Sequence, residues 1–497
     1  MGSIKGATEL VNFLRKNIST IKYVFAFVYL IYFSFTYNSY VDYYCGFITT
    51  PLYTVLMLSG AVILAIDFFV SGFLVRFKYS CLLILFYCSL LISIFINIQH
   101  NPIGNFKVLV WLLIQTFLLN TVNSGCKETF DFKRFRIMFE AVAAVFFAGC
   151  LASIVMFLCG YGTYLPNEDF SSGYVRAGLV DGRLFGVFND PNYASICVMI
   201  TMALIIINMI MHREKCWLKI YHWILLFIDF VYIVLSRSRT TELCFYIFVA
   251  VVGFFLVFSY IKKKEIKKNA RGIAISCVAA IICVCTSLGL FTVTNAVFDK
   301  VYVAASGLHS DYDSEHDYKE DLIREDVDEQ NVSNNRFAIW NDYFRVSFEK
   351  PLFGSGPRNE LEYIKEHMPE SFVARRGYSS HNGYLGLWVG SGIIGTVFML
   401  GYMFLNVKLI AGYLIRKSGS DEKYYIPILL LATVLAVIAV AAVSLKAIFF
   451  CNSIIDQLFW FILGFTVFLV SLSEPEKFEK EPLAYRILSK SPLIKTN

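Results

Sequence analysis

Long apolar blocks separated by short polar segments dominate the chain. Most blocks run for about 20 residues, the length of a helix that crosses a bilayer. Apolar residues follow one another within a block, without the alternation that the strands of a transmembrane barrel require. Because only helices and closed barrels span a bilayer, the pattern predicts an all-α polytopic membrane protein with about 12 membrane helices.

The predicted helices form two consecutive sets. The first set covers residues 22–39, 51–70, 79–98, 107–123, 138–160 and 190–211. The second set covers residues 217–235, 240–261, 272–295, 382–414, 425–445 and 449–472. The 382–414 block is long for one crossing, so we expect this helix to be tilted or to leave the membrane at its ends.

Composition agrees with a membrane protein. Hydrophobic residues make up 57% of the chain and charged residues only 16%, whereas a soluble domain carries about 25% charged residues. The 13 cysteines lie almost entirely in apolar blocks or short loops, and none lies in the largest polar segment, roughly 297–380. We therefore expect no disulfide framework.

Lysines and arginines in the short loops predict the orientation of the chain. Basic clusters recur in every second loop, at residues 127–136, 213–219, 262–271 and 416–423. The positive-inside rule then places both termini inside and two longer segments, roughly 161–189 and 297–380, outside.

Three regions follow from this topology. Residues 1–296 carry the first nine membrane helices, residues 297–381 form an extracytoplasmic loop or lid, and residues 382–497 carry the last three helices and a cytoplasmic tail. In the loop, Asp311, Asp313 and Glu315 have the carboxylates of a calcium site. The turn glycine of an EF-hand loop is missing, so we favour a solvated acidic stretch over a metal site.

Arginines on the predicted outer side depart from the positive-inside pattern. They lie at or near the predicted helix ends and are Arg183, Arg237, Arg239, Arg336, Arg375 and Arg376. The planar guanidinium makes bidentate, charge-assisted hydrogen bonds to phosphate, so the group fits a lipid-linked pyrophosphate. For any single arginine, contact with lipid headgroups or with an acid such as Glu242 is the alternative.

His381 lies between Arg375 and Arg376 on one side and the apolar run "GYLGLWVG" on the other. A neutral imidazole accepts a proton from a hydroxyl near neutral pH, which makes His381 a candidate general base. The alternative is an ordinary histidine at the start of a helix, where Ser379 or Ser380 is a candidate N-cap. Asn189 or Asp190 is likewise a candidate cap before the helix at 190–211.

Four motifs occur in order: "GRLFGVFNDPNYAS", "SRSRTTEL", "NNRFAIWNDYFRVSFEKPLFGSGP" and "SHNGYLGLWVGSGIIG". Together they resemble the O-antigen ligase/polymerase superfamily of bacterial envelope enzymes (WaaL-like ligases and Wzy-type polymerases) over roughly residues 180–400. The resemblance implies a metal-independent glycosyltransferase with a helical fold of the GT-C type. Its donor would be a glycan on undecaprenyl pyrophosphate, and no cofactor or nucleotide is needed.

The resemblance also implies roles for individual residues. Arg183, Arg239 and Arg336 would bind the donor pyrophosphate and stabilise its charge as it leaves. His381 would accept the proton of the acceptor hydroxyl, and the transfer would invert the anomeric centre. "SRSRTTEL" has two arginines and lacks the glycine expected after "SR", so Arg237 remains an alternative to Arg239. Arg376 is a further candidate phosphate contact.

Location and partners follow from the same resemblance. The protein would lie in the bacterial cytoplasmic membrane as a multi-pass protein with its active site facing outside. Its partners would be donor and acceptor glycans linked to undecaprenyl pyrophosphate, membrane lipids, a chain-length regulator and a flippase, with no nucleic acid.

Two alternatives to a polysaccharide polymerase stay open. An O-antigen ligase would transfer the glycan to lipid A core or another acceptor, and the aromatic-rich chain favours the polymerase. A flippase for lipid-linked oligosaccharide could use Asp229, Glu242, Lys446 and Asp456, which lie in or near apolar blocks, to line a path. The absence of a matching pair of broken helices in the sequence pattern, and the large outer loop, argue against a transporter.

Overall fold

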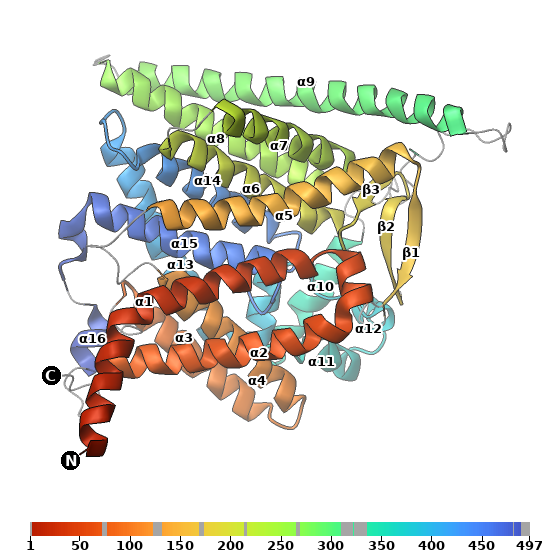
Figure 1. Cartoon of the computed structure of the whole chain (residues 1–497). Coiled ribbons are helices and arrows are strands. Elements are labelled where there is room, and N and C mark those ends of the chain that lie inside the picture. The colour runs from red at the N-terminus through yellow and green to blue at the C-terminus, as the bar shows by residue number, and fades with distance from the viewer. Residues whose placement is uncertain are drawn as a thin grey trace.

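The computed structural model describes residues 2–71, 77–122, 132–167, 173–212, 216–264, 269–309, 322, 335–480 and 482–488. Long helices lie side by side and form one bundle (Figure 1). The start of α1 (Gly2–Thr36) and the short helix α16 (Leu483–Leu488) lie at one end of the bundle, which we call the terminal end. A small sheet and three short helices lie at the opposite end, which we call the sheet end.

Within the described ranges, ten helical segments are long and apolar enough to cross a membrane. Their elements are α1 (Gly2–Thr36), α2 (Ser39–Ser71), α4 (Pro102–Leu113) continued by η2 (Ile114–Leu118) and η3 (Leu119–Thr121), α5 (Phe132–Leu158), α6 (Pro191–Met211), α7 (Cys216–Leu235), α8 (Arg239–Lys263), α9 (Asn269–His309), α13 (Gly383–Lys417) and α15 (Ile454–Ser473). Two shorter apolar helices, α3 (Ser80–Ile96) and α14 (Tyr425–Ala441), complete the set. Each of the 12 segments predicted to cross the membrane overlaps one of these helices, which confirms the polytopic helical fold.

Burial separates the helices at the centre of the bundle from those at its edge. In α15, 94% of the residues in the apolar window are buried, whereas the share is 11% in both α8 and α9. α9 runs along one side of the bundle with α8 beside it (Figure 1). Because their exposed side chains are mostly apolar, α8 and α9 present a face that only lipid can solvate well.

The sheet was not predicted from the sequence. Strands β1 (Gly162–Pro166), β2 (Tyr174–Val180) and β3 (Arg183–Gly186) form an antiparallel sheet in the order β1-β2-β3. Asp181 and Gly182, both at positive φ, make the two-residue turn between β2 and β3. This turn places Arg183 at the first position of β3.

Helix α13 is broken at Gly392, where φ is 65° and ψ is −177°. The turn at residues 351–356 fills the break: Ser355 N–H donates to the Val389 carbonyl (2.9 Å), and Ile393 N–H donates to the Pro351 carbonyl (2.8 Å). This turn, which is buried from Gly354 to Gly356, thus pairs backbone groups that the break leaves open, as a membrane protein requires. The long 382–414 block is therefore two helical halves that extend to Lys417.

A second irregular stretch joins α14 to α15. Sequence analysis predicted helices up to residue 445 and from residue 449, but α14 ends at Ala441 and α15 begins at Ile454. We call the connection the 442–453 segment. Asp456 stabilises it by accepting hydrogen bonds from the N–H groups of Ile448 (2.5 Å) and Ser453 (2.8 Å).

Three short helices cover the sheet end of α13: α10 (Arg336–Val346), α11 (Glu360–His367) and α12 (Phe372–Arg376). Their shared apolar cluster comprises Ile339, Tyr343, Val346, Tyr363, Ile364, Val373 and Val389. η5 (Pro475–Phe478) and α16 (Leu483–Leu488) follow α15 at the terminal end. α10, α11 and α12 are therefore packed as one unit on α13 (Figure 1).

We expect Gly392→Ala to lower the free energy of unfolding by about 1–3 kcal/mol, because an L-residue is strained at this φ and its Cβ would lie 2.3 Å from the Leu352 carbonyl. The melting temperature of the purified protein in detergent measures the effect. Gly401→Ala is the matched control in the same helix, since its Cβ would meet only Leu82 Cδ1 at 3.7 Å. Equal melting temperatures for the two variants would contradict the proposed strain.

Candidate functional site

The residues predicted to carry chemistry gather at the sheet end of the bundle. Arg183 begins β3, Arg239 begins α8, Arg336 begins α10, and His381 lies two residues before α13. The four residues are far apart in the sequence, and the fold brings the ends of the elements that carry or follow them to the same end of the bundle.

Arg183 is buried, with 6% of its surface exposed. Its guanidinium donates to the Ser236 carbonyl (Nε–O 3.2 Å) and to Asn192 Oδ1 (Nη2–Oδ1 2.9 Å). The same Oδ1 accepts a hydrogen bond from the Ser238 hydroxyl (2.9 Å). Arg183 thus connects β3, the start of α6 and the α7–α8 turn.

The two arginines of the α7–α8 turn have different surroundings. Arg237, at φ 49°, forms an ion pair with Asp299 of α9 (2.8 Å) and donates to the Leu322 carbonyl. Arg239 is exposed, and its guanidinium makes no hydrogen bond or ion pair with any residue that the structure describes. Arg237 therefore ties the turn to α9, while the guanidinium of Arg239 is open to an anion.

His381 is partly buried and has a left-handed backbone (φ 43°). Burial lowers the pKa of its imidazole below the usual value; the nearby Arg336 cation lowers this pKa further, and Asp190 opposes the effect. A lowered pKa keeps the imidazole neutral near pH 7, the form that accepts a proton. The geometry therefore brings His381, Arg336 and Asp190 into one electrostatic neighbourhood.

The caps of the adjoining helices fix the backbone around this neighbourhood. Asp190, one of the two predicted candidates, caps α6 by accepting hydrogen bonds from Asn192 and Tyr193 N–H. Neither Ser379 nor Ser380 caps α13, because Asn382 Oδ1 accepts from Tyr384 and Leu385 N–H (both 3.0 Å). Ser380 instead donates its hydroxyl proton to the Asn382 carbonyl (2.9 Å).

Arg375 and Arg376 end α12 and are exposed. Neither guanidinium makes a hydrogen bond or ion pair with another described residue. Both guanidinium groups lie within six residues of His381 in the chain and are available to an anion at the sheet end.

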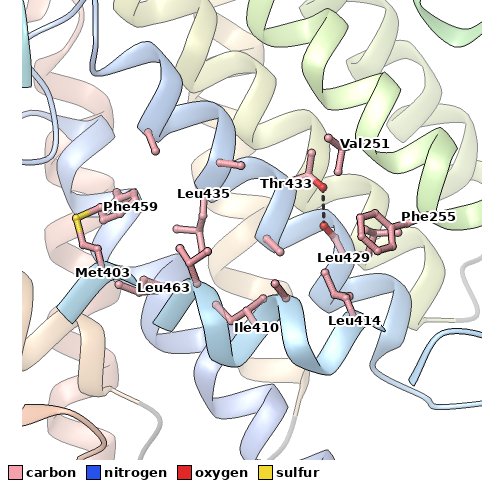
Figure 2. Close-up of a pocket in the computed structure, with 15 residues that line it drawn as sticks. Val251, Phe255, Met403, Ile410, Leu414, Leu429, Thr433, Leu435, Phe459 and Leu463 are labelled. Carbon is pink, nitrogen blue, oxygen red and sulfur yellow. Dashed lines mark hydrogen bonds between the residues drawn. The ribbon is translucent and has the colours of Figure 1, made fainter. Parts of the chain in front are cut away.

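An apolar groove of about 230 Å³ lies among α8, α13, α14 and α15 (Figure 2). Its walls include Phe255, Met403, Leu414 and Phe459. Thr433 is the only hydroxyl among the lining side chains, and it donates to the Leu429 carbonyl of its own helix (2.8 Å). The groove therefore offers no polar group that lacks a partner.

Metal ligands do not gather in the described part of the chain, where no group of three His, Cys, Asp or Glu side chains could hold a metal ion. Asp311, Asp313 and Glu315 lie outside the described residues.

Comparison with known families gives a match over residues 224–400 to the family described as O-antigen ligase. The matched segment contains Arg237, Arg239, Arg336 and His381. Arg183 lies outside the matched segment, because it precedes residue 224. This match over about a third of the chain supports the resemblance of its motifs to the O-antigen ligase/polymerase superfamily. No protein in a search of curated proteins matches the chain.

Sequence reasoning gave no role to several residues that organise this site. Asn192 lies within a quoted motif, and its amide is the common acceptor for Arg183 and Ser238. Lys446 was considered only as part of a transport path, yet its side chain forms an ion pair with Glu360. Asparagine at the start of a helix is the one signal that would have indicated Asn192 from the sequence.

We expect Arg336→Ala to raise the pKa of His381, because the substitution removes a cation that disfavours the charged imidazole. Asp190→Asn keeps the cap of α6 and should lower the same pKa further. The measurement is the pH dependence of His381 modification by diethylpyrocarbonate, followed by mass spectrometry, since only neutral imidazole reacts. Arg345→Ala, an exposed site on the same helix, is the control. An unchanged midpoint in Arg336→Ala would contradict the electrostatic coupling.

Proposed function

We propose that this membrane glycosyltransferase polymerises oligosaccharide repeat units linked to undecaprenyl pyrophosphate into a surface polysaccharide, either O-antigen or capsule. The observation that carries the proposal is the position of His381 near Arg336, inside the segment that matches the O-antigen ligase family. Burial and the Arg336 cation lower the pKa of His381, so its imidazole is neutral near pH 7. A neutral base beside a fixed cation suits a reaction that removes a proton and releases an anion.

The donor pyrophosphate would be bound by the cationic groups at the sheet end. Arg239 and Arg376 are exposed and open to an anion, and Arg336 lies beside His381. The buried Arg183 would act by holding Asn192 and the α7–α8 turn, which fixes the start of α8 where Arg239 stands. Arg237 is already paired with Asp299, so we assign the phosphate contact to Arg239.

In the transfer step, the acceptor hydroxyl gives its proton to the His381 imidazole as its oxygen attacks the anomeric carbon of the donor. A new glycosidic bond forms and the bond from that carbon to the phosphate oxygen breaks. The electron pair leaves with the pyrophosphate, whose charge the arginines stabilise. Attack opposite the leaving group inverts the anomeric configuration.

The apolar groove supports a lipid-linked donor. The same four helices that line it begin or end at the sheet end, and Ala439 at its wall accepts a hydrogen bond from the Tyr384 hydroxyl (2.9 Å), three residues after His381. A pyrophosphate at the site would have its isoprenoid tail directed along these helices, and the groove supplies the apolar wall that such a tail needs (Figure 2).

The predicted orientation supports an outward-facing site in the bacterial cytoplasmic membrane. Lys262, Lys263, Arg416 and Lys417 lie at the end of the bundle away from the sheet, as the positive-inside rule requires of a cytoplasmic end. In this orientation both termini are inside and the sheet end faces the compartment where undecaprenyl-linked glycans are assembled.

A ligase and a transporter are the competing functions. A ligase would use the same donor chemistry and differ only in its acceptor. For the transporter, three of the four proposed path residues have local partners: Glu242 accepts from Tyr246, Asp456 caps α15, and Lys446 pairs with Glu360. The fourth, Asp229, is buried in α7, where neither carboxylate oxygen has a hydrogen-bond partner among the described residues. These contacts favour structural roles over a continuous polar path.

We expect His381→Ala and Arg336→Ala each to slow glycosyl transfer by about 10²–10⁴-fold, the usual contribution of a general base or a charge-stabilising group. Arg239→Ala should weaken binding of the lipid-linked donor more than Arg237→Ala does. The assay is conversion of lipid-linked repeat units in proteoliposomes, with the products separated by size.

The size of the product separates the candidate functions. Lipid-linked ladders of increasing length support a polymerase, and glycan on a new acceptor supports a ligase. Wild-type activity in both His381→Ala and Arg336→Ala would overturn the proposed mechanism, and translocation without a new glycosidic bond would favour the transporter.

A further inference from the structure

A buried ion pair lies close to the candidate base. Lys446 Nζ of the 442–453 segment pairs with Glu360 Oε1, and the two side chains are 16% and 5% exposed. Glu360 is the first residue of α11, 86 positions away in sequence. The second oxygen of its carboxylate, Oε2, is buried and has no hydrogen-bond partner among the described residues. Lys446 is thus the group that compensates the charge of this carboxylate.

Stability alone is a weak reason for such a pair. Removing two charges from water costs about as much as their attraction returns, and well-packed apolar residues often replace a buried pair without loss. The 442–453 segment also carries backbone strain, because Ile448 (φ 74°) and Phe450 (φ 53°) occupy the left-handed region that bulky residues avoid. Strain of this kind persists where the surroundings fix the backbone, commonly at functional sites.

On the lysine side, the 442–453 segment contacts three elements of the candidate site. Gly383 N–H, at the start of α13, donates to the Ala442 carbonyl (2.8 Å). The Tyr193 hydroxyl of α6 donates to the Lys446 carbonyl (3.1 Å) and accepts from Lys446 N–H (2.9 Å). The Thr240 hydroxyl of α8, beside Arg239, bonds to the Ser444 hydroxyl (3.1 Å).

The contact with α13 is close as well as directional. A Cβ on Gly383 would lie 2.2 Å from the Ala447 carbonyl oxygen, so the start of α13 rests directly on the 442–453 segment. His381 precedes this point by two residues, and no hydrogen bond joins its ring to another described residue. The 442–453 segment therefore supports the backbone next to His381, and the imidazole itself contacts the Tyr378 ring (centroids 6.1 Å apart).

On the glutamate side, Glu360 belongs to the unit that carries Arg336. α11 packs on α10 through Tyr363, Ile364, Ile339 and Tyr343, and Arg336 is the first residue of α10. Glu360 Oε2 and Ser380 Oγ both lie within 3.6 Å of the position where a Cβ on Gly386 would stand. The ion pair thus lies close to Ser380, the residue that precedes His381.

We infer that the Lys446–Glu360 ion pair is a positioning contact that sets the placement of His381 relative to Arg336. Lys446 belongs to the segment that contacts Gly383, two residues after His381. Glu360 belongs to the group of short helices that begins with Arg336. The ion pair therefore joins the two parts of the chain that carry His381 and Arg336. The two residues act through His381 and Arg336 and do not themselves react. This inference rests on the proposed function, because it assigns the pair a role in the same transfer step.

The test compares Lys446→Met and Glu360→Gln with the double charge swap Lys446→Glu/Glu360→Lys in proteoliposomes. Each single variant should lower kcat by about 10- to 100-fold, the cost of a misplaced reacting group, and leave KM for the lipid-linked donor within about twofold of wild type. The charge swap should recover part of kcat. Arg416→Met, which breaks the Arg416–Glu474 pair at the terminal end, is the matched control and should leave kcat unchanged.

A second readout does not depend on turnover. If the pair positions His381 near Arg336, breaking it lets the two separate, and the pKa of His381 rises. The midpoint of His381 modification by diethylpyrocarbonate should therefore move to higher pH in Glu360→Gln and stay in place in Arg416→Met. Glu360→Gln keeps the shape of the side chain, so it carries the test if Lys446→Met does not fold.

Three results would overturn the inference. One is an unchanged kcat in folded single variants, the second is a raised KM at unchanged kcat, which would make Lys446 a substrate contact, and the third is an unmoved modification midpoint. A wild-type protein that transfers no glycan would defeat the proposed function instead, and the modification midpoint would still decide whether the ion pair positions His381.

Discussion

The need to pair every backbone polar group inside the membrane governs this structure. Two stretches give up helical hydrogen bonds, at Gly392 in α13 and in the 442–453 segment, and each is paired from elsewhere in the chain. The turn at residues 351–356 fills the first, and Asp456 with Tyr193 supports the second. Because both stretches adjoin the first half of α13, the same hydrogen bonds that keep the backbone satisfied also locate His381.

Electrostatics at the sheet end is built on this backbone frame. Burial and the Arg336 cation lower the pKa of His381, and Asp190 moderates the effect from the cap of α6. Arg237 and Arg183 are used inside the protein, one on Asp299 and one on Asn192. The arginines that remain open, Arg239, Arg375 and Arg376, are exposed at the starts and ends of helices. This division between internal and open cations is the basis of the anion site that we propose.

The sequence predicts the helices well because a run of about 20 apolar residues is a local signal that neighbouring elements rarely override. The motifs that resemble the O-antigen ligase family can be recognised for the same reason, since each is short and contiguous. The sequence does not predict the sheet, whose strands have at most seven residues. It also leaves Arg237 and Arg239 equivalent, because the partner that distinguishes them, Asp299, is 62 positions away. Ser379 and Ser380 were reasonable caps by residue type, but the chain turns at His381 and Asn382 takes that role.

The apolar groove has a consequence for how fast such a protein meets its substrate. Val407 lines the groove and is 60% exposed, and the neighbouring α8 is among the least buried helices, so the groove is reached from the side of the bundle. A lipid that arrives from the side never leaves the bilayer, and its search is a diffusion in two dimensions. For the lipid-linked donor that we propose, the quantity that sets occupancy would then be the mole fraction of carrier lipid in the membrane, and dilution of the surrounding water would leave it unaltered.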